Sequence, residues 1–357
     1  MPQTLDIQTA PSANETLRLM RERLRRVMPD FEIEMKADLA FRINQLKRER
    51  NAVILGHNYM EPALYHSVPD YVGDSLELSR ISTETDADII VFCGVQFMAE
   101  TAKVLNPEKT VLIPSEKAGC SLASGISAQD VVNLKDMFPG APVVTYVNTY
   151  ADVKAESDYC CTSGNATAVV RYLLEQGHER IIFLPDEYLA RYTARENGIG
   201  FAFPPLFKGQ TPDIPSGRTI IGWRARCEVH EKFEVEDVRR VREQFPDVAV
   251  LAHPECSPEV IAAVDRVGST KQLIQFVQEM DAPQYLLLTE CSMGDNIAAE
   301  NPDKEMLRLC SFRCPHMNQI TMEDTLAALE NIQYKIELDP AVIERARTPI
   351  DRMLAIR

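Results

Sequence analysis

Three apolar runs rich in β-branched residues recur along the chain, and each ends abruptly on a polar residue. The runs, with the polar residue at the end of each, are 53–58 with His57, 143–148 with Asn148, and 248–253 with His253. A helical stretch follows each run, and then a short run led by Asp, at 88–93, 158–163 and 265–270. After a second helical stretch comes a third apolar run, at 110–114, 180–185 and 284–289. Short apolar runs bounded in this way are typical of buried strands, so the pattern predicts one β-α-β-α-β unit written three times.

Strands that alternate with helices indicate parallel sheets joined by right-handed crossovers. A chain of 357 residues is also longer than one hydrophobic core usually serves. We therefore predict an α/β fold of three similar three-layer αβα domains with parallel sheets, in a pseudo-threefold arrangement around a central active site. The predicted segments are an N-terminal extension and helix (1–37), three repeats (38–127, 128–212 and 213–317), and C-terminal helices (318–357) that pack on the first repeat.

The first copy is longer than the others between the ends of its first two strands. The spacing there is 36 positions, against 15 and 17 in the second and third copies. We interpret the excess as an insertion that carries Tyr59 and the sequence Gly-Asp-Ser at 73–75, and that can close over a ligand. The Pro- and Gly-rich stretch 203–217 indicates a linker between the second and third copies.

Polar residues at the strand ends are the expected binding positions. In open α/β sheets ligands bind beyond the carboxyl ends of the strands, where His57, Asn148 and His253 fall. Helix starts at equivalent points of the three copies could bind carboxylate or phosphate through free backbone N–H groups, at 74–75, 162–165 and 268–270. Any one of them could be an ordinary N-cap, but their recurrence favours binding.

Composition and charge narrow the class of protein. Apolar residues make up 45% and charged residues 25%, as in an ordinary soluble protein. The apolar runs are far shorter than the ~20 residues that span a bilayer, and 1–13 lacks the basic start and apolar stretch of a secretory signal, so we expect a cytoplasmic protein with no membrane partner. A net charge of −15 argues against nucleic acid, which needs a basic face. Anionic substrates would therefore require a locally positive site, supplied by helix N-termini, a metal or buried Arg and Lys.

The cysteines indicate metal binding or catalysis rather than disulfides. There are nine, an odd number, at irregular spacing, and a disulfide framework is not expected in a reducing compartment. Cys93, Cys160 and Cys161 lie inside apolar runs, so we expect them to be buried core residues.

Each copy also contributes a cysteine beyond its third predicted strand. These are Cys120, then Cys227, and then Cys310 with Cys314. Three thiolates from distant segments could converge on a pseudo-threefold axis and hold a metal or cluster. Structural zinc sites usually show paired, short cysteine spacings and four ligands, whereas this chain has no Cys-x-x-Cys and three residues separate Cys310 from Cys314. A [4Fe–4S] cluster held by three cysteines would leave one iron free to act as a Lewis acid.

Seven segments in order along 51–357 together resemble the quinolinate synthase family. They are Gly-His-Asn-Tyr (56–59), Gly-Asp-Ser-Leu-Glu (73–77), 95–103, Tyr-Val-Asn-Thr (146–149), Thr-Ser-Gly-Asn (162–165), His-Pro-Glu (253–255) and Val-Gly-Ser-Thr (267–270). The resemblance implies three α/β domains around a central site and an oxygen-sensitive [4Fe–4S] cluster on three cysteines. It also implies condensation of iminoaspartate with dihydroxyacetone phosphate to quinolinate, with loss of phosphate and two waters, in NAD biosynthesis. An aspartate-oxidising enzyme is a candidate partner that would supply iminoaspartate.

Carried over position by position, the resemblance implies cluster ligands at Cys120, Cys227 and Cys314. The implied catalytic residue of the insertion is Tyr59, and the implied substrate-binding residues are His57, Ser75, Tyr146, Asn148, Ser163, His253, Glu255 and Thr270. Members of the family often carry a Cys-x-x-Cys-x-x-Cys run near the last ligand. Here the spacing is Cys310-x-x-x-Cys314, and because Cys314 retains the following Pro, we expect Cys314 rather than Cys310 to be the ligand.

Proton transfer is expected from a few of these residues. Glu255, two residues after His253, is the expected general acid/base, and the imidazoles of His57 and His253 are further candidates. Tyr59 would assist proton transfer, and His230 is expected to orient a group that contacts the cluster or the substrate.

Two other classes fit parts of the pattern. A cluster-bearing redox sensor without catalysis would need a partner surface or a nucleic-acid face, and the net charge of −15 offers no support for the latter. A metal-dependent aldolase or hydratase would share the strand-end sites, but would use His or carboxylate ligands in place of three widely spaced cysteines.

Overall fold

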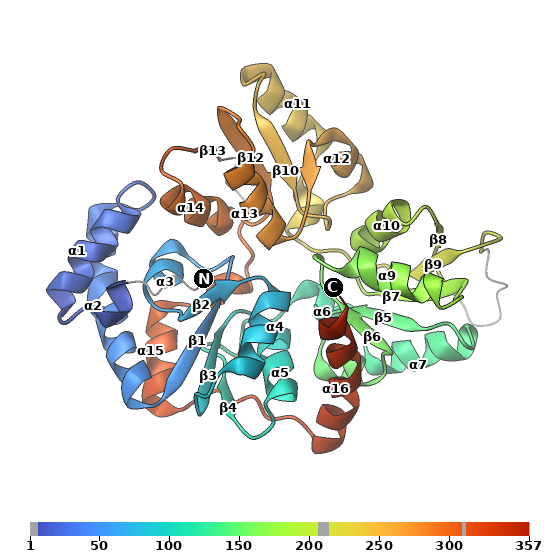
Figure 1. The fold of residues 1–357 in the computed structure, drawn as a ribbon, viewed down its shortest axis with the longest axis horizontal. Coiled ribbons are helices and arrows are strands. Elements are labelled where there is room, and N and C mark those ends of the chain that lie inside the picture. The colour runs from blue at the N-terminus through green and yellow to red at the C-terminus, as the bar shows by residue number, and fades with distance from the viewer. Residues whose placement is uncertain (1–5, 206–213, 309–311, 357) are drawn as a thin grey trace.

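The computed structural model describes residues 6–205, 214–308 and 312–356. In this part of the chain the strands form three separate sheets, and all of their pairings are parallel. Helices flank the sheets, and the three units lie as lobes around the middle of the molecule (Figure 1). The predicted α/β class with three parallel sheets is confirmed, while the pseudo-threefold arrangement stays a prediction.

The first sheet has the strand order β2-β1-β3-β4. Its unit consists of β1 (Ala52–His57), α3 (Pro62–Ser67), β2 (Tyr71–Gly73), α4 (Ser75–Glu84), β3 (Ile89–Cys93), α5 (Gln96–Leu105) and β4 (Thr110–Leu112). The elements before it are η1 (Asp6–Thr9), α1 (Ala13–Leu24) and α2 (Asp30–Glu49). Two helices lead on to the second unit, α6 (Ser121–Ser124) and α7 (Ala128–Met137).

The second and third sheets have the orders β6-β5-β7-β9-β8 and β11-β10-β12-β13. The second unit consists of β5 (Val143–Tyr146), α8 (Ala151–Ala155), β6 (Tyr159–Cys161), α9 (Ala166–Glu175), β7 (Arg180–Leu184), α10 (Glu187–Glu196), β8 (Gly200–Ala202) and β9 (Thr219–Gly222). After η2 (His230–Lys232) and α11 (Val235–Gln244), the third unit consists of β10 (Ala249–Ala252), α12 (Pro258–Ala263), β11 (Arg266–Val267), α13 (Thr270–Glu279), β12 (Gln284–Leu288), α14 (Cys291–Glu300) and β13 (Glu305–Leu307).

The repeating unit is longer than the apolar pattern predicted. Each copy has a further strand after a third helix, so that the shared core of the sheets is four strands. The predicted insertion in the first copy is wrong, because its excess residues are a regular α3-β2-α4 segment and the second strand is β2 rather than 88–93. Strand β9 pairs with β7 and β8, so the second unit extends past residue 212, where the predicted segment ended.

One aspartate in each unit shows the repetition directly. Asp70, Asp158 and Asp265 each stand just before the second strand of their unit. Each carboxylate accepts a backbone N–H of the first strand, over 2.8 Å from Ile54, 2.8 Å from Val143 and 2.7 Å from Val250. The N–H of each aspartate in turn donates to the carbonyl of the same first-strand residue. This paired contact sets the register of a short edge strand in each unit.

The apolar core is divided unevenly among the units. One continuous cluster of buried side chains extends from the N-terminal helices through the first sheet into the second unit and the C-terminal helices. The third sheet is covered by two smaller clusters of its own. Val250 and Leu286 belong to one, and their strand neighbours Leu251 and Tyr285 belong to the other, as alternation across a sheet requires.

The C-terminal elements join the first two units. They are η3 (Met317–Gln319), α15 (Met322–Asn331) and α16 (Pro340–Ala355). Helix α15 packs on α2 and β3, whereas α16 lies against α8 and β6 of the second unit as well as α5 of the first. The chain between them pairs with the edge of β4, where Ile336 N–H donates to the Val111 carbonyl over 2.9 Å. From the sequence we expected the C-terminal helices to pack on the first repeat, and the contacts of α16 with the second unit are additional. None of the described helices combines the length and apolar character that crossing a membrane requires.

Candidate active site

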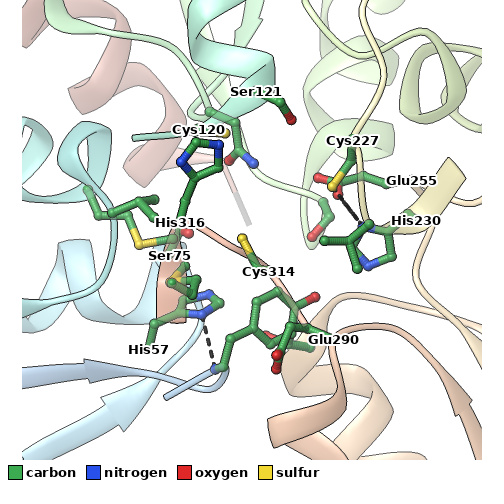
Figure 2. Close-up of a pocket in the computed structure, with 18 of the residues that line it drawn as sticks. His57, Ser75, Cys120, Ser121, Cys227, His230, Glu255, Glu290, Cys314 and His316 are labelled. Atoms are coloured by element: carbon green, nitrogen blue, oxygen red, sulfur yellow. Dashed lines mark hydrogen bonds and ion pairs between the residues drawn. The ribbon is translucent and has the colours of Figure 1, made fainter. Parts of the chain in front are cut away.

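A cavity lies where the three units meet, and all three contribute to its lining (Figure 2). Every catalytic, substrate-binding and cluster-ligand residue expected from the sequence lines this cavity. The first unit and the loop after it contribute His57, Tyr59, Ser75 and Cys120. The second contributes Tyr146, Asn148, Ser163 and Cys227, and the third contributes His253, Glu255, Thr270 and Cys314. The structure therefore brings together positions up to 257 residues apart, from His57 to Cys314.

The strand-end histidines of the first and third units have the same local geometry. His57 is the last residue of β1, and His253 directly follows β10. In each case the imidazole Nδ1 accepts the backbone N–H two residues on, from Tyr59 over 3.2 Å and from Glu255 over 3.4 Å. Each Nε2 must then carry the hydrogen, and that of His253 lies 3.1 Å from Ser163 Oγ. Burial lowers the pKa of both imidazoles to about 3, so both are neutral near pH 7.

Helix starts from the three units meet at the cavity. Ser75 begins α4, Thr270 begins α13, and Ser163 lies in the turn before α9. The units touch here, because the Asn58 amide donates to Thr270 Oγ1 over 2.9 Å and Ser269 Oγ donates to Asp74 over 3.4 Å. Free N–H groups and the helix dipole make these starts suitable for carboxylate or phosphate.

Each of the three cysteines follows the strand in the fourth place of the shared four-strand order of its sheet, not the third strand of its unit. Cys120 comes after β4, Cys227 after β9 and Cys314 after β13. In two units the helix after the third strand holds the cysteine loop, because its first N–H donates to the carbonyl two residues before the cysteine. These bonds are Gln96 N to Ala118 O at 2.7 Å and Glu187 N to Ala225 O at 2.9 Å.

The cysteine loops also contact one another. Glu228 N–H donates to Ser121 Oγ over 3.4 Å, and the Trp223 indole N–H donates to the Gly125 carbonyl over 2.9 Å. Glu228 Oε1 lies 3.0 Å from His316 Nε2, which brings in the third loop. The residues next to the three cysteines therefore hold the loops together around the cavity.

Three thiols converge on this space (Figure 2). Burial raises the pKa of Cys120 to about 12 and that of Cys314 to about 11, and it raises the pKa of Cys227 as well. The thiols are thus protonated until a bound cation reverses the balance. Soft sulfur donors of this kind fit an iron–sulfur cluster. Cys93, Cys160 and Cys161 are fully buried in the core, as predicted, and Cys310 lies outside the described residues.

Glu255 is buried and surrounded by groups that favour its ionised form. Its Oε2 lies 2.7 Å from His230 Nδ1 and 3.7 Å from His253 Nδ1. Burial alone would raise the pKa of Glu255, but these imidazoles and hydrogen bonds from His230 and Tyr146 lower it below its ordinary value. His230 stacks on His253 with ring centres 4.6 Å apart.

A hydrogen-bonded chain connects Tyr59 to Glu255. Tyr59 Oη lies 2.6 Å from Thr289 Oγ1, and Thr289 Oγ1 lies 3.0 Å from His230 Nε2. The ring continues through Nδ1 to the Glu255 carboxylate, and Nδ1 also lies 3.2 Å from Cys227 Sγ. Tyr59 belongs to the loop between β1 and α3 and is not part of an inserted lid.

Sequence reasoning missed Thr289 and Glu290. Both follow β12, and Glu290 caps α14 by accepting Ser292 N–H over 2.8 Å. Burial raises the pKa of the Glu290 carboxyl to about 7, and the side chain lines the cavity. Asp186 caps α10 at the same point after β7, two residues beyond the third strand. Applying the polar strand-end pattern to third strands as well as first strands would have found them.

A mixed set of donors overlaps the thiols. One ligand atom each from Cys227, His230 and Glu255 lie within 4.8 Å of one another, close enough to hold a single metal ion. The cavity can thus support metal chemistry, anion binding and proton transfer at one place.

Comparison with known proteins agrees with the geometry. The quinolinate synthetase A protein family matches residues 41–355. Quinolinate synthase 2 of Mesorhizobium japonicum is 48% identical over 94% of this chain and 96% of its own length. The quinolinate synthases of Agrobacterium fabrum and Caulobacter vibrioides are 49% and 44% identical, over 94% and 98% of this chain and 90% and 88% of their own lengths. With most of its length matched and its cysteines, strand ends and helix starts gathered in one cavity, the chain belongs to the quinolinate synthetase A family.

Proposed function

We propose that this protein condenses iminoaspartate with dihydroxyacetone phosphate to give quinolinate, phosphate and two waters, in the de novo synthesis of NAD. The observation that carries the proposal is the meeting, in one cavity, of three cysteines, three helix starts and the chain from Tyr59 to Glu255. An aspartate-oxidising enzyme would supply iminoaspartate, and we place the reaction in the cytoplasm.

The proposed cofactor is one [4Fe–4S] cluster held by Cys120, Cys227 and Cys314. Among the described residues, these are the cysteines that line the cavity. When bound, the cluster would offer one iron without a protein ligand as a Lewis acid for a substrate oxygen. Because the thiols have raised pKa values, loading the site releases protons and becomes more favourable as the pH rises.

Anion binding is assigned to the helix starts. Ser75, Ser163 and Thr270 offer hydroxyl groups beside free backbone N–H groups, which suit the carboxylates of iminoaspartate and the phosphate of the triose. These dipoles supply local positive potential inside a chain of net charge −15. Tyr146 and Asn148 complete the polar wall on the side of the second unit.

Proton movement is assigned to Glu255 and the residues bonded to it. The ionised carboxylate can accept a proton from the substrate carbon or nitrogen and return it to a departing hydroxyl group. With His230 Nδ1–H donating to the carboxylate, His230 Nε2 accepts from Thr289, and Thr289 accepts from Tyr59. All hydrogen bonds then point the same way, so a proton taken up at the Tyr59 end can be matched by one released at Glu255. Neutral His57 and His253 would donate Nε2–H groups to substrate oxygens.

Anaerobic reconstitution tests the cofactor. The assignment requires about four iron and four sulfide per chain. We expect Cys120→Ala, Cys227→Ala and Cys314→Ala each to lose the cluster absorbance, while Cys310→Ala and the buried control Cys160→Ala keep it. Loss in Cys310→Ala with retention in Cys314→Ala would make the choice of ligand wrong. Formation of quinolinate and release of phosphate from the two substrates test the reaction.

A single metal ion at Cys227, His230 and Glu255 is the second candidate, because their donor atoms lie within 4.8 Å of one another. It would favour a metal-dependent aldolase or hydratase with a mixed donor set. Metal analysis separates the two, since this candidate requires about one zinc or other divalent ion per chain in place of about four iron.

A further inference from the structure

A buried lysine lies directly behind the wall of the cavity. Lys154, on α8, has no exposed surface. Its Nζ donates to the backbone carbonyl of Val147 over 2.9 Å and to that of Thr149. These two carbonyls belong to the residues immediately before and after Asn148. One side chain therefore holds the backbone on both sides of a cavity residue.

The surroundings of Lys154 show that its hydrogen bonds to the backbone are its main polar contacts. Among the described residues no carboxylate forms an ion pair with it within 4.0 Å. The carboxylate of nearby Glu100 is engaged elsewhere, with Ala151 N–H at 2.7 Å and the Gln96 amide at 2.9 Å. The Phe97 ring centre lies 5.5 Å from Nζ. A buried polar group without partners is costly, so the donors of Lys154 keep both carbonyls turned toward it.

The side-chain oxygen of Asn148, unlike the ammonium group of Lys154, has no hydrogen bond among the described residues. The side chain of Asn148 lines the cavity, and this Oδ1 is buried. Two further hydrogen bonds fix the neighbouring residues, from Val147 N–H to the Cys161 carbonyl at 2.9 Å and from the Thr149 hydroxyl to the Tyr146 carbonyl at 3.1 Å. With the flanking carbonyls held on the α8 side, the amide of Asn148 is left to meet a ligand in the cavity.

We propose that Lys154 is a positioning residue that sets the direction in which Asn148 enters the cavity and thereby sets the affinity for the pyridine dicarboxylate and its precursors. The proposal rests on the proposed function only for the role of Asn148 in ligand binding. Lys154 does not line the cavity itself, although the Phe97 ring near its Nζ does. We expect its action on binding to pass through Asn148, whose flanking carbonyls it holds, and that dependence can be measured.

A double-mutant cycle with quinolinate as the probe tests this, using the reconstituted full chain under anaerobic conditions. Lys154→Met keeps a side chain of similar length without donors. Because a misplacement of about 1 Å can cost about 100-fold, we expect Lys154→Met to weaken quinolinate binding by about 10- to 100-fold. In an Asn148→Ala background the same change should weaken binding by less than about 3-fold, since interacting residues are non-additive.

Lys47→Met is the matched control. Lys47 is also buried and donates to a backbone carbonyl, that of Val68 at 2.9 Å. It pairs with Asp70 at 2.9 Å as well, and neither Val68 nor Asp70 is next to a residue that lines the cavity. This variant should lower the thermal midpoint and leave quinolinate affinity unchanged. If Lys154→Met does not fold, Lys154→Gln, which keeps an N–H donor, takes its place in the cycle.

The outcomes separate the two ideas. Equal losses on changing Lys154 in the wild-type and Asn148→Ala backgrounds would overturn the positioning role alone, as would unchanged affinity in Lys154→Met. Unchanged affinity in Asn148→Ala would instead overturn the assignment of Asn148 under the proposed function, and the positioning role with it. A non-additive loss together with a silent Lys47→Met supports the proposal.

Discussion

Replacing Thr289 by Val removes the central link between Tyr59 and Glu255 with almost no change of shape. The Thr289 hydroxyl contacts Tyr59 Oη at 2.6 Å and His230 Nε2 at 3.0 Å, and its side chain is 2% exposed. The substitution leaves two polar atoms facing a methyl group. At about 1–3 kcal/mol for each unsatisfied group, the folded protein should lose roughly 2–6 kcal/mol of stability. If the hydrogen bonds from Tyr59 to Glu255 transfer protons, kcat should fall by about 10²- to 10⁴-fold as well.

The assay combines the initial rate of quinolinate formation, measured anaerobically across pH, with the thermal midpoint and the cluster absorbance. Thr325→Val is the matched control, because Thr325 is fully buried, donates to the Thr321 carbonyl over 2.7 Å and lies outside the cavity lining. It should lower the midpoint by less than Thr289→Val does, because the Thr321 carbonyl keeps the Thr325 backbone N–H at 3.0 Å, and it should leave kcat unchanged. A Thr289→Val protein with a lowered midpoint, an intact cluster and an unchanged kcat would refute proton transfer along this chain and leave Thr289 a structural residue.

Three further predictions concern proton binding, the repeated aspartate and the carboxylate. Burial lowers the pKa of His66 to about 3, below its unfolded value of about 6.5. The unfolded state then binds more protons, so the free energy of unfolding should fall as the pH drops from about 6.5 to about 3. In equilibrium unfolding of His66→Gln, the slope of this free energy against pH should be smaller by about 1.4 kcal/mol per pH unit. Asp265→Asn should lower the free energy of unfolding by about 1–2 kcal/mol, because it weakens the 2.7 Å hydrogen bond from Val250 N–H. Amide hydrogen exchange should become faster first in the third unit, and an equal increase in all three units would contradict this prediction. Glu255→Gln should retain the cluster absorbance and lose about 10²- to 10⁴-fold in kcat, and unchanged turnover would remove Glu255 from acid/base catalysis.

The sequence predicted those features that depend on local pattern. Long buried strands such as β1 and β12 follow from apolar runs, and the polar residues at their ends follow from the topology of parallel sheets. Strand β2 has only three residues and was missed, whereas β6 and β11 fall within the Asp-led runs that the sequence predicted. The position of β2 comes from pairing with the central strand and from Asp70, which are tertiary contacts.

The hydrogen bonds that connect Tyr59 to Glu255 could not be predicted from the sequence either. Tyr59 and Thr289 are 230 positions apart and come from different units. Their contact depends on how two lobes meet, and no spacing along the chain records that. The cysteine ligands could be predicted from the sequence because each follows a strand at an equivalent place in its unit. This held even though the sequence predicted that strand to be the third of its unit, which it is not.

The uneven division of the apolar core has a consequence for how the molecule unfolds. The first two units share one continuous cluster, while the third sheet has clusters of its own. Without a cofactor, heating should therefore reveal two separate calorimetric transitions, one for each body. Cys120, Cys227 and Cys314 all pack against the first cluster, but Cys314 follows the last strand of the third unit, so thiols joined through iron would tie the end of the third unit to the first body. Loading the site should then merge the two transitions into one at a higher temperature, so that cofactor content can be read from cooperativity alone.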